Sequence, residues 1–350
     1  MGPKKKDGQK KASAEPDPGE MPETLLTQYQ KFCKMTAMPL CEQVIQTLTD
    51  EEKKEAFLAS KQLVVHPADP RDPTEPRIGP GGMRAICTSI LGTAPGMIPY
   101  KGVNCLRIWW SKIGDDGACA LAELLRLGGS EVQINYLELW DNQIGPRGAL
   151  ALGRSLMVGN NRSLLTLKLD YNRSLGTEGV AALCRGLRTN STLKQLHLPF
   201  CNIDADGGAP IGDMLAFSKL GLTLLNLRGN YLGDAGLGNL CPGLSRTASL
   251  TELSLADNSI GSNPDDLEPL RMFSETLMTS TTLCRIDLNH NRLHAEAAEV
   301  LLPALAPENA RIQMFTVDPD LPTEIFEKLN RAGGGKKGKK GKKGGKKKKK

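Results

Sequence analysis

The sequence has few aromatic residues, few histidines and no long apolar run. Aromatic residues make up 4% of the 350 positions, and four residues are histidine. A core built from this chain must therefore be aliphatic, which disfavours folds organised around aromatic packing. No apolar stretch reaches the length of a membrane span, and the polar start from Gly2 to Glu20 does not resemble a secretory signal. We expect an intracellular protein without a membrane span.

Sequence patterns that carry chemistry are equally scarce. The nine cysteines include no C-x-x-C pair, and most lie in apolar patterns, which predicts reduced, buried thiols. A Gly-rich stretch ends at Lys336 and Lys337 but lacks the Ser or Thr of a phosphate-binding loop. The segment 204–208 only faintly resembles a calcium loop. His197 and Cys201 share one repeat unit, but the cysteine position is predicted to point inward. We expect no catalytic residue, no cofactor and no metal.

Charge is distributed unevenly along the chain. The net charge is +6, but residues 336–350 hold eleven lysines and no acid, so residues 1–335 carry −5. Such an asymmetry concerns partners rather than the fold. We predict that the tail binds a polyanion. The candidates are nucleic acid, anionic lipid and the acidic tails of tubulin, and no base-reading motif favours nucleic acid. The residues are Lys336, Lys337, Lys339, Lys340, Lys342, Lys343, Lys346, Lys347, Lys348, Lys349 and Lys350.

A pattern of 28 to 33 residues repeats through most of the chain. The template L-x-x-L-x-L-x-x-N-x-I-G-x-x-G starts at Val103, Ile134, Leu164, Leu193, Leu222, Leu250, Leu283 and Ile312. Its apolar positions 1, 4 and 6 predict a short strand with one face on the core, and a helical pattern follows the Gly-containing turn. No such unit buries its apolar face alone, so the units are expected to stack.

Position 9 of the template is mostly asparagine, which is unusual for an inward-facing site. It is Asn142, Asn172, Asn230, Asn258 and Asn291 in five repeats, whereas Ser111 and Cys201 occupy it in two others. An amide there can bond backbone groups that the turning chain would otherwise leave unpaired.

The period, the I-G-x-x-G turn and the choice of Asn or Cys at position 9 resemble the ribonuclease-inhibitor-like class of leucine-rich repeats. The resemblance implies an α/β solenoid shaped like a horseshoe, with a parallel sheet on the concave face, helices on the convex face and a helical N-terminal cap. The predicted organisation is a disordered N-terminus (1–20), a helical cap (21–60), an irregular first repeat with a Pro-rich insertion (61–102), regular repeats with a C-terminal cap (103–330) and a disordered Lys/Gly tail (331–350).

Aromatic side chains gather at positions 7 and 8 of the first four regular repeats. They are Trp109, Trp110, Trp140, Tyr171 and Phe200, and we call them the aromatic row. Neighbouring strands should place them side by side on the concave face, where exposed Trp and Tyr often anchor interfaces. Arg107, Glu138, Lys168 and Asp170 are interleaved with them and are predicted to set the register of a protein partner. The alternative is that the rings shield the arc or pack against the inserted loop.

The repeats, the helical cap and the Lys/Gly tail together resemble leucine-rich-repeat proteins of the ciliary and flagellar axoneme. That resemblance implies a non-catalytic cytoskeletal scaffold whose tail contacts an acidic surface such as the tails of tubulin. Alternatives are a GTPase-activating protein similar to the Ran regulator, whose family carries an acidic tail instead, a nuclear or cytoplasmic adaptor, and an inhibitor of a basic enzyme.

Overall fold

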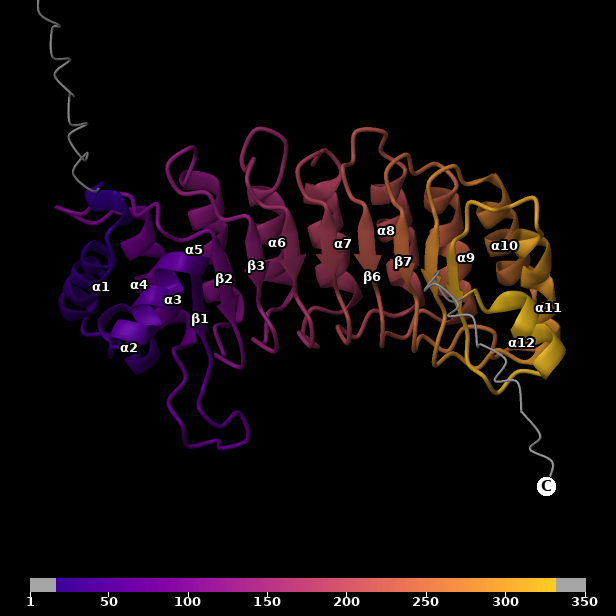
Figure 1. Ribbon diagram of the computed structural model, residues 1–350, viewed down its shortest axis with the longest axis horizontal. Helices are drawn as coiled ribbons and strands as arrows, with labels where there is room; N and C mark the ends of the chain where they lie inside the picture. Colours follow the sequence, from indigo (N-terminus) through magenta and orange to yellow (C-terminus); the bar gives the residue numbers. More distant parts are fainter. Residues whose placement is uncertain (1–16, 332–350) are drawn as a thin grey trace, which may run out of the picture.

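The computed structural model describes residues 17–331, and its centre is one parallel sheet of nine strands in chain order. The strands lie side by side along the whole length of the molecule (Figure 1). They are β1 (Gln62–Val65), β2 (Cys105–Ile108), β3 (Tyr136–Glu138), β4 (Thr166–Lys168), β5 (Gln195–His197), β6 (Leu224–Asn226), β7 (Glu252–Ser254), β8 (Arg285–Asp287) and β9 (Met314–Thr316). The predicted open solenoid of leucine-rich-repeat type is confirmed.

One helix follows most strands and packs on the helices before and after it. Those of the repeats are α4 (Gly79–Leu91), α5 (Gly114–Leu127), α6 (Pro146–Ser155), α7 (Gly176–Leu187), α8 (Gly208–Leu215), α9 (Gly233–Leu244), α10 (Glu268–Thr279) and α11 (Ala295–Leu301), with short 3-10 helices at Ala205–Gly207 and Leu302–Leu305. Helices need about 8–10 Å between axes and strands about 4.8 Å, so the sheet lines the inner side of the curve. Template positions 1, 4 and 6 are fully buried between the two layers, as Ile134, Leu137 and Leu139 illustrate.

The position-9 side chains form a ladder that links successive repeats. Asn172 donates to the carbonyl oxygens of Leu139 and Leu169, both at 2.8 Å, and its own oxygen accepts the backbone N–H groups of Asn142 and Ile144 at 3.0 and 3.1 Å. Each amide therefore satisfies groups in its own repeat and in the one before it. We name these side chains the asparagine ladder.

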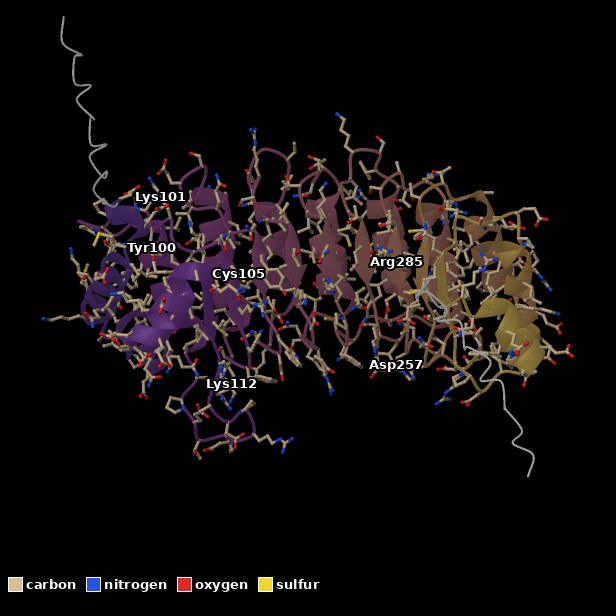
Figure 2. All side chains as sticks on the ribbon, viewed as in Figure 1. Tyr100, Lys101, Cys105, Lys112, Asp257 and Arg285 are labelled. Carbon is tan, nitrogen blue, oxygen red and sulfur yellow. The ribbon has the colours of Figure 1, made fainter. Side chains whose placement is uncertain are left out.

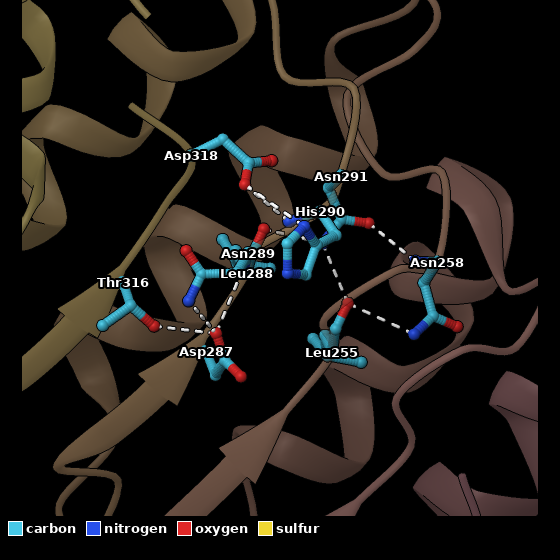
Figure 3. A network of polar contacts seen from close by, with 9 residues as sticks. All are labelled: Leu255, Asn258, Asp287, Leu288, Asn289, His290, Asn291, Thr316 and Asp318. Atoms are coloured by element: carbon cyan, nitrogen blue, oxygen red, sulfur yellow. Dashed lines mark hydrogen bonds and ion pairs between the residues drawn. The ribbon is translucent and has the colours of Figure 1, made fainter. Parts of the chain in front are cut away.

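The ladder runs on through the C-terminal repeats. Figure 3 shows Asn258 and Asn291, where Asn291 donates to the Leu255 carbonyl and accepts the backbone N–H of Asn258, at 2.9 Å in both cases. Cys201 occupies one rung, and its thiol donates to the Leu169 carbonyl at 3.1 Å. The ladder thus extends from Ser111, which donates its backbone N–H to Asn142, to Asn291.

Elements outside the regular repeats close both ends of the sheet. Helices α1 (Pro22–Thr36), α2 (Glu42–Thr49) and α3 (Glu51–Ser60) lie at the N-terminal end, where α2 and α3 contact β1. At the other end α12 (Thr323–Leu329) packs on α11, and Arg331 pairs with Phe315 of β9 through its backbone. The Arg331 guanidinium also donates to carbonyl oxygens of Asn309 and Ile312 at 3.1 and 2.9 Å.

Residues 17–20 and Arg331 were predicted to be disordered, but they are ordered. Residues 17–20 were assigned to the disordered N-terminus, but Pro18–Glu20 forms a 3-10 helix and the Gly19 carbonyl accepts the backbone N–H of Lys101 at 2.6 Å. Arg331 was assigned to the tail, but it completes the edge of the sheet. In both cases the chain supplies partners for backbone groups that would otherwise be left at an open end. The remainder of the predicted tail, residues 332–350, lies outside the described residues.

We predict that Asn172→Ala destabilises the protein by about 3 kcal/mol or more, because it leaves several buried backbone groups unpaired at about 1–3 kcal/mol each. Asn172→Cys should cost less, since a thiol still donates, as Cys201 does. Chemical unfolding measures both. The control is Asn135→Ala, at a half-buried position whose side chain makes no hydrogen bond within residues 17–331. An Asn172→Ala cost as small as that of the control would contradict the role of the ladder.

Candidate functional site

The five side chains of the aromatic row form one continuous stack on the edge where the strands end. Ring centroids are 4.9 Å apart for Trp110 and Trp140, 5.5 Å for Trp140 and Tyr171, and 4.6 Å for Tyr171 and Phe200. Trp109 makes edge contacts with the other two tryptophans at 6.4 and 6.5 Å. The spacing follows from the sheet, because neighbouring strands are about 4.8 Å apart. All five rings are partly exposed.

The row extends by one residue that the sequence analysis missed. His66 directly follows β1 and stacks on Trp109 with ring centroids 5.8 Å apart. The sheet register explains this contact, because Val65 pairs with Ile108 and His66 thus takes the position of Trp109 in the irregular first repeat. Alignment of Leu63 and Val65 with Leu106 and Ile108 is the signal that could have placed it.

At its other end the row stops against a glycine. The Phe200 ring lies directly over Gly229, so closely that a Cβ atom there would be 2.2 Å from the ring. The side chain at this position is absent in repeat five because the ring of repeat four occupies its space. The aromatic row therefore ends at β6, and the positions beyond it carry Arg228, Asp257 and His290.

Three residues of the row hold an unusual backbone conformation. Trp110, Tyr171 and Phe200 have φ angles of 47°, 62° and 56°, which lie in the left-handed region. In the other regular repeats the same template position is Asp141, Gly229, Asp257 or His290, with φ angles of 49°, 68°, 56° and 60°. A bulky residue in this region costs about 1 kcal/mol or more relative to glycine. The stacking of the rings, about 0.5–1.5 kcal/mol per pair, offsets this cost.

The long loop between β1 and α4, residues 66–78, stands beside the row and projects beyond the edge where the strands end (Figure 1). It is braced internally, because the Arg77 guanidinium donates to the carbonyl oxygens of Pro70 and Asp72 at 3.0 and 2.9 Å. Glu75 accepts the backbone N–H of Asp69 at 2.6 Å. A cavity of about 540 Å³ lies between this loop and α2, with His66 in its wall. The loop contacts the aromatic row through His66. This contact corresponds to part of the alternative in which the rings pack against the inserted loop.

The predicted charged residues fall into one cluster and one isolated group. Arg107 and Glu138 form an ion pair at 3.7 Å, and the Tyr136 hydroxyl donates to Glu138 at 2.9 Å. The Arg107 guanidinium and the Lys168 ammonium lie 5.1 and 5.7 Å from the centre of the Tyr136 ring. Tyr136, at template position 3, therefore organises the cluster. The prediction omitted it, although alternation along a strand puts position 3 on the same face as position 5.

Asp170 is the isolated group. Among residues 17–331, its Oδ1 atom is enclosed and has no hydrogen-bond partner. Burial raises the pKa of this carboxyl to about 6. In the next strand, burial lowers the pKa of His197 to about 4, with a smaller contribution from Lys168. The imidazole is therefore neutral near pH 7 and does not compensate the charge of Asp170.

Residues 17–331 show no clear arrangement of catalytic side chains or metal ligands. Cys201 is buried, which raises the pKa of its thiol, and its contacts are backbone carbonyls of the ladder. Asp204 accepts hydrogen bonds from Asp206 and Thr177, so it caps a turn. Within residues 17–331 no three His, Cys, Asp or Glu side chains are grouped as metal ligands, and no helix is both long and apolar enough to cross a bilayer. None of the nine cysteines, all in this range, forms a disulfide.

Comparisons with known proteins identify leucine-rich repeats in this chain. Family models described as leucine-rich repeats match residues 134–153, 160–184, 189–212 and 249–270. A protein of Mus musculus, NACHT, LRR and PYD domains-containing protein 9C, is 30% identical over 129 residues, which are 37% of this chain and 12% of that protein. The chain thus matches about one eighth of that relative.

Solved structures of similar shape include leiomodin-1 actin-binding site 2 and the tropomodulin C-terminal domain of Caenorhabditis elegans. Their TM-scores are 0.37 and 0.38, with 18% and 15% sequence identity. Each alignment covers 47% of this chain, and 92% and 93% of the respective structure.

We predict that Gly229→Ala destabilises the protein by about 2 kcal/mol or more, because its Cβ meets the Phe200 ring and its φ angle is 68°. In a Phe200→Ala background the steric part should vanish and leave about 1 kcal/mol. Gly233→Ala is the matched control, because it has a φ angle of 56° and nothing within 4 Å. Its cost should be the same in both backgrounds. Equal costs of Gly229→Ala in the two backgrounds would contradict the stacking of Phe200 on Gly229.

Proposed function

We propose that this chain is a non-catalytic scaffold that binds a protein partner along the aromatic row, and that its lysine tail contacts an acidic surface such as the tails of tubulin. The setting we propose is the axoneme of a cilium or flagellum. Leucine-rich repeats imply a framework for protein–protein interaction, and the finer assignment rests on the row, on the charge pattern of the chain and on its resemblance to axonemal repeat proteins.

The single observation that carries the partner-binding proposal is the partly exposed stack of five rings, three of which stand on left-handed backbone. The residue before each ladder position is left-handed in every repeat from Trp110 to His290, and large aromatic side chains occupy three of these positions in the first half of the arc. Strain that the surrounding structure holds in place is concentrated at functional sites. Large, rigid aromatic side chains are also the residues that most often dominate binding energy.

The tail proposal rests on charge alone. Eleven lysines in residues 336–350 oppose a net charge of −6 for residues 21–335, so the two parts favour partners of opposite sign. Each lysine near an anionic surface contributes up to about 1 kcal/mol at physiological ionic strength. A protein filament that carries a row of carboxylates would offer the lysines such an anionic surface over a large area.

The partner proposal predicts that Trp109→Ala together with Trp140→Ala removes specific partners. Crosslinking mass spectrometry on native cells that express the full chain measures this, because it reports partners of the arc and of the tail separately. Tyr231→Ala is the control, an exposed aromatic outside the row. Thermal unfolding checks that each variant is folded. Unchanged crosslinks from residues around the row in the double variant would refute the assignment.

The tail proposal predicts that replacing the eleven tail lysines with glutamine weakens co-sedimentation with microtubules by about tenfold or more. Proteolytic removal of the acidic tubulin tails should have the same effect on the unaltered chain, and the Trp109 and Trp140 variant should still co-sediment. Binding that persists without the lysines, or that is indifferent to the tubulin tails, would argue against tubulin as the acidic surface.

A further inference from the structure

The carboxylates on the inner face of the arc differ in how well they are satisfied. In the C-terminal half, Asp287 accepts hydrogen bonds from the Thr316 hydroxyl at 2.8 Å and from the Asn289 amide at 2.7 Å (Figure 3). Asp318 accepts the backbone N–H of His290 at 2.8 Å. Asp170, in the aromatic half, has no such donor. Among residues 17–331, Asp170 is the carboxylate that has an enclosed oxygen atom without a hydrogen-bond partner.

Among residues 17–331 no neighbour of Asp170 forms an ion pair with it, although Lys168 acts on it from a greater distance. On β3 Glu138 is engaged by Arg107 and Tyr136, and it carries the same sign as Asp170. On β4 Lys168 lies over the Tyr136 ring, and its charge opposes the effect of burial on the pKa of Asp170 without outweighing it. On β5 His197 is neutral near pH 7 because burial lowers its pKa to about 4. Within the described residues Asp170 therefore lacks a directly paired cation, and Lys168 offsets its charge only in part.

We infer that Asp170 receives a basic side chain, an arginine or a lysine, of the protein that binds the aromatic row. This inference rests on the function proposed above and adds the chemistry of the partner. By register Asp170 follows Trp140 at template position 7, and it directly precedes Tyr171 in the chain. A bound segment that covers these rings therefore passes over the carboxylate.

A cation gains more here than at an ordinary surface carboxylate. Asp170 has already lost part of its hydration on folding, so an incoming charge does not have to strip that water away. Its pKa of about 6 still leaves the carboxylate ionised near pH 7. Burial also raises the pKa of Asp141, the other acid beside Trp140, and the charge of Arg173 opposes that rise. The acidic body of the chain also favours approach of a basic partner.

A selection of phage-displayed random 12-residue peptides on the full chain tests the inference. The Trp109→Ala, Trp140→Ala double variant serves for counter-selection, so that only peptides that need the aromatic row are kept. We expect these peptides to be enriched in arginine or lysine. Their affinity should fall about tenfold or more for Asp170→Asn. Asp257→Asn is the matched control, on the same edge of the arc but beyond the row (Figure 2), and it should leave affinity unchanged.

The pH dependence gives a second readout that a merely structural role would not produce. For a selected peptide without histidine or acidic residues, affinity should fall up to about tenfold from pH 7.5 to pH 5 as Asp170 takes up a proton. Over this range Lys168 stays charged and His197 stays neutral. The Asp170→Asn variant should lose this dependence while its unfolding midpoint is unchanged or higher.

Two results would overturn the inference in distinguishable ways. Row-dependent peptides that lack a basic residue, or that bind Asp170→Asn as tightly as the unaltered chain, would contradict the role of Asp170 and leave the proposed binding surface intact. Failure to enrich any peptide that needs the two tryptophans would contradict the proposed binding surface itself, and the role of Asp170 with it.

Discussion

The asparagine ladder is the interaction on which the arrangement of the repeats depends. Each strand is three or four residues long and turns sharply at its end, so several backbone groups face the interior without a strand partner. One amide per repeat satisfies these groups and reaches into the preceding repeat at the same time. The spacing of the strands, the conformation of the turn and the position of every side chain on that edge follow from this repeated contact.

The asparagine ladder determines where the side chains of the aromatic row lie. Because the chain enters the left-handed region one residue before each ladder position, the residue there is carried toward the exposed edge of the sheet. In Figure 2, Lys112 and Asp257 mark this edge, whereas Cys105 and Arg285 lie on the strands. Rings at this edge stack at the strand spacing without any further support. The scaffold thus presents the rings along one edge, and the charged cluster around Tyr136 lies on the face beside them.

The repeat period was sufficient to predict the sheet, the inward asparagines and the contacts along the aromatic row, because each is a local consequence of one template. Contacts that cross from irregular to regular segments were not predictable in this way. The stacking of His66 on Trp109, the helix at Pro18–Glu20 and the pairing of Arg331 with β9 all involve residues outside the template. The lack of a partner for Asp170 was also invisible, because it depends on the distances of Lys168 and His197 in three dimensions.

The row has two defined ends, with His66 against Trp109 at β1 and Phe200 over Gly229 at β6. The rings from His66 to Phe200 follow five strands, whose four intervals of about 4.8 Å span about 19 Å. An extended chain of about six residues has that length. For the partner that we propose, these ends set a length: a shorter extended segment would leave rings in contact with water, and a longer one would run onto the loop at one end or the polar half of the sheet at the other.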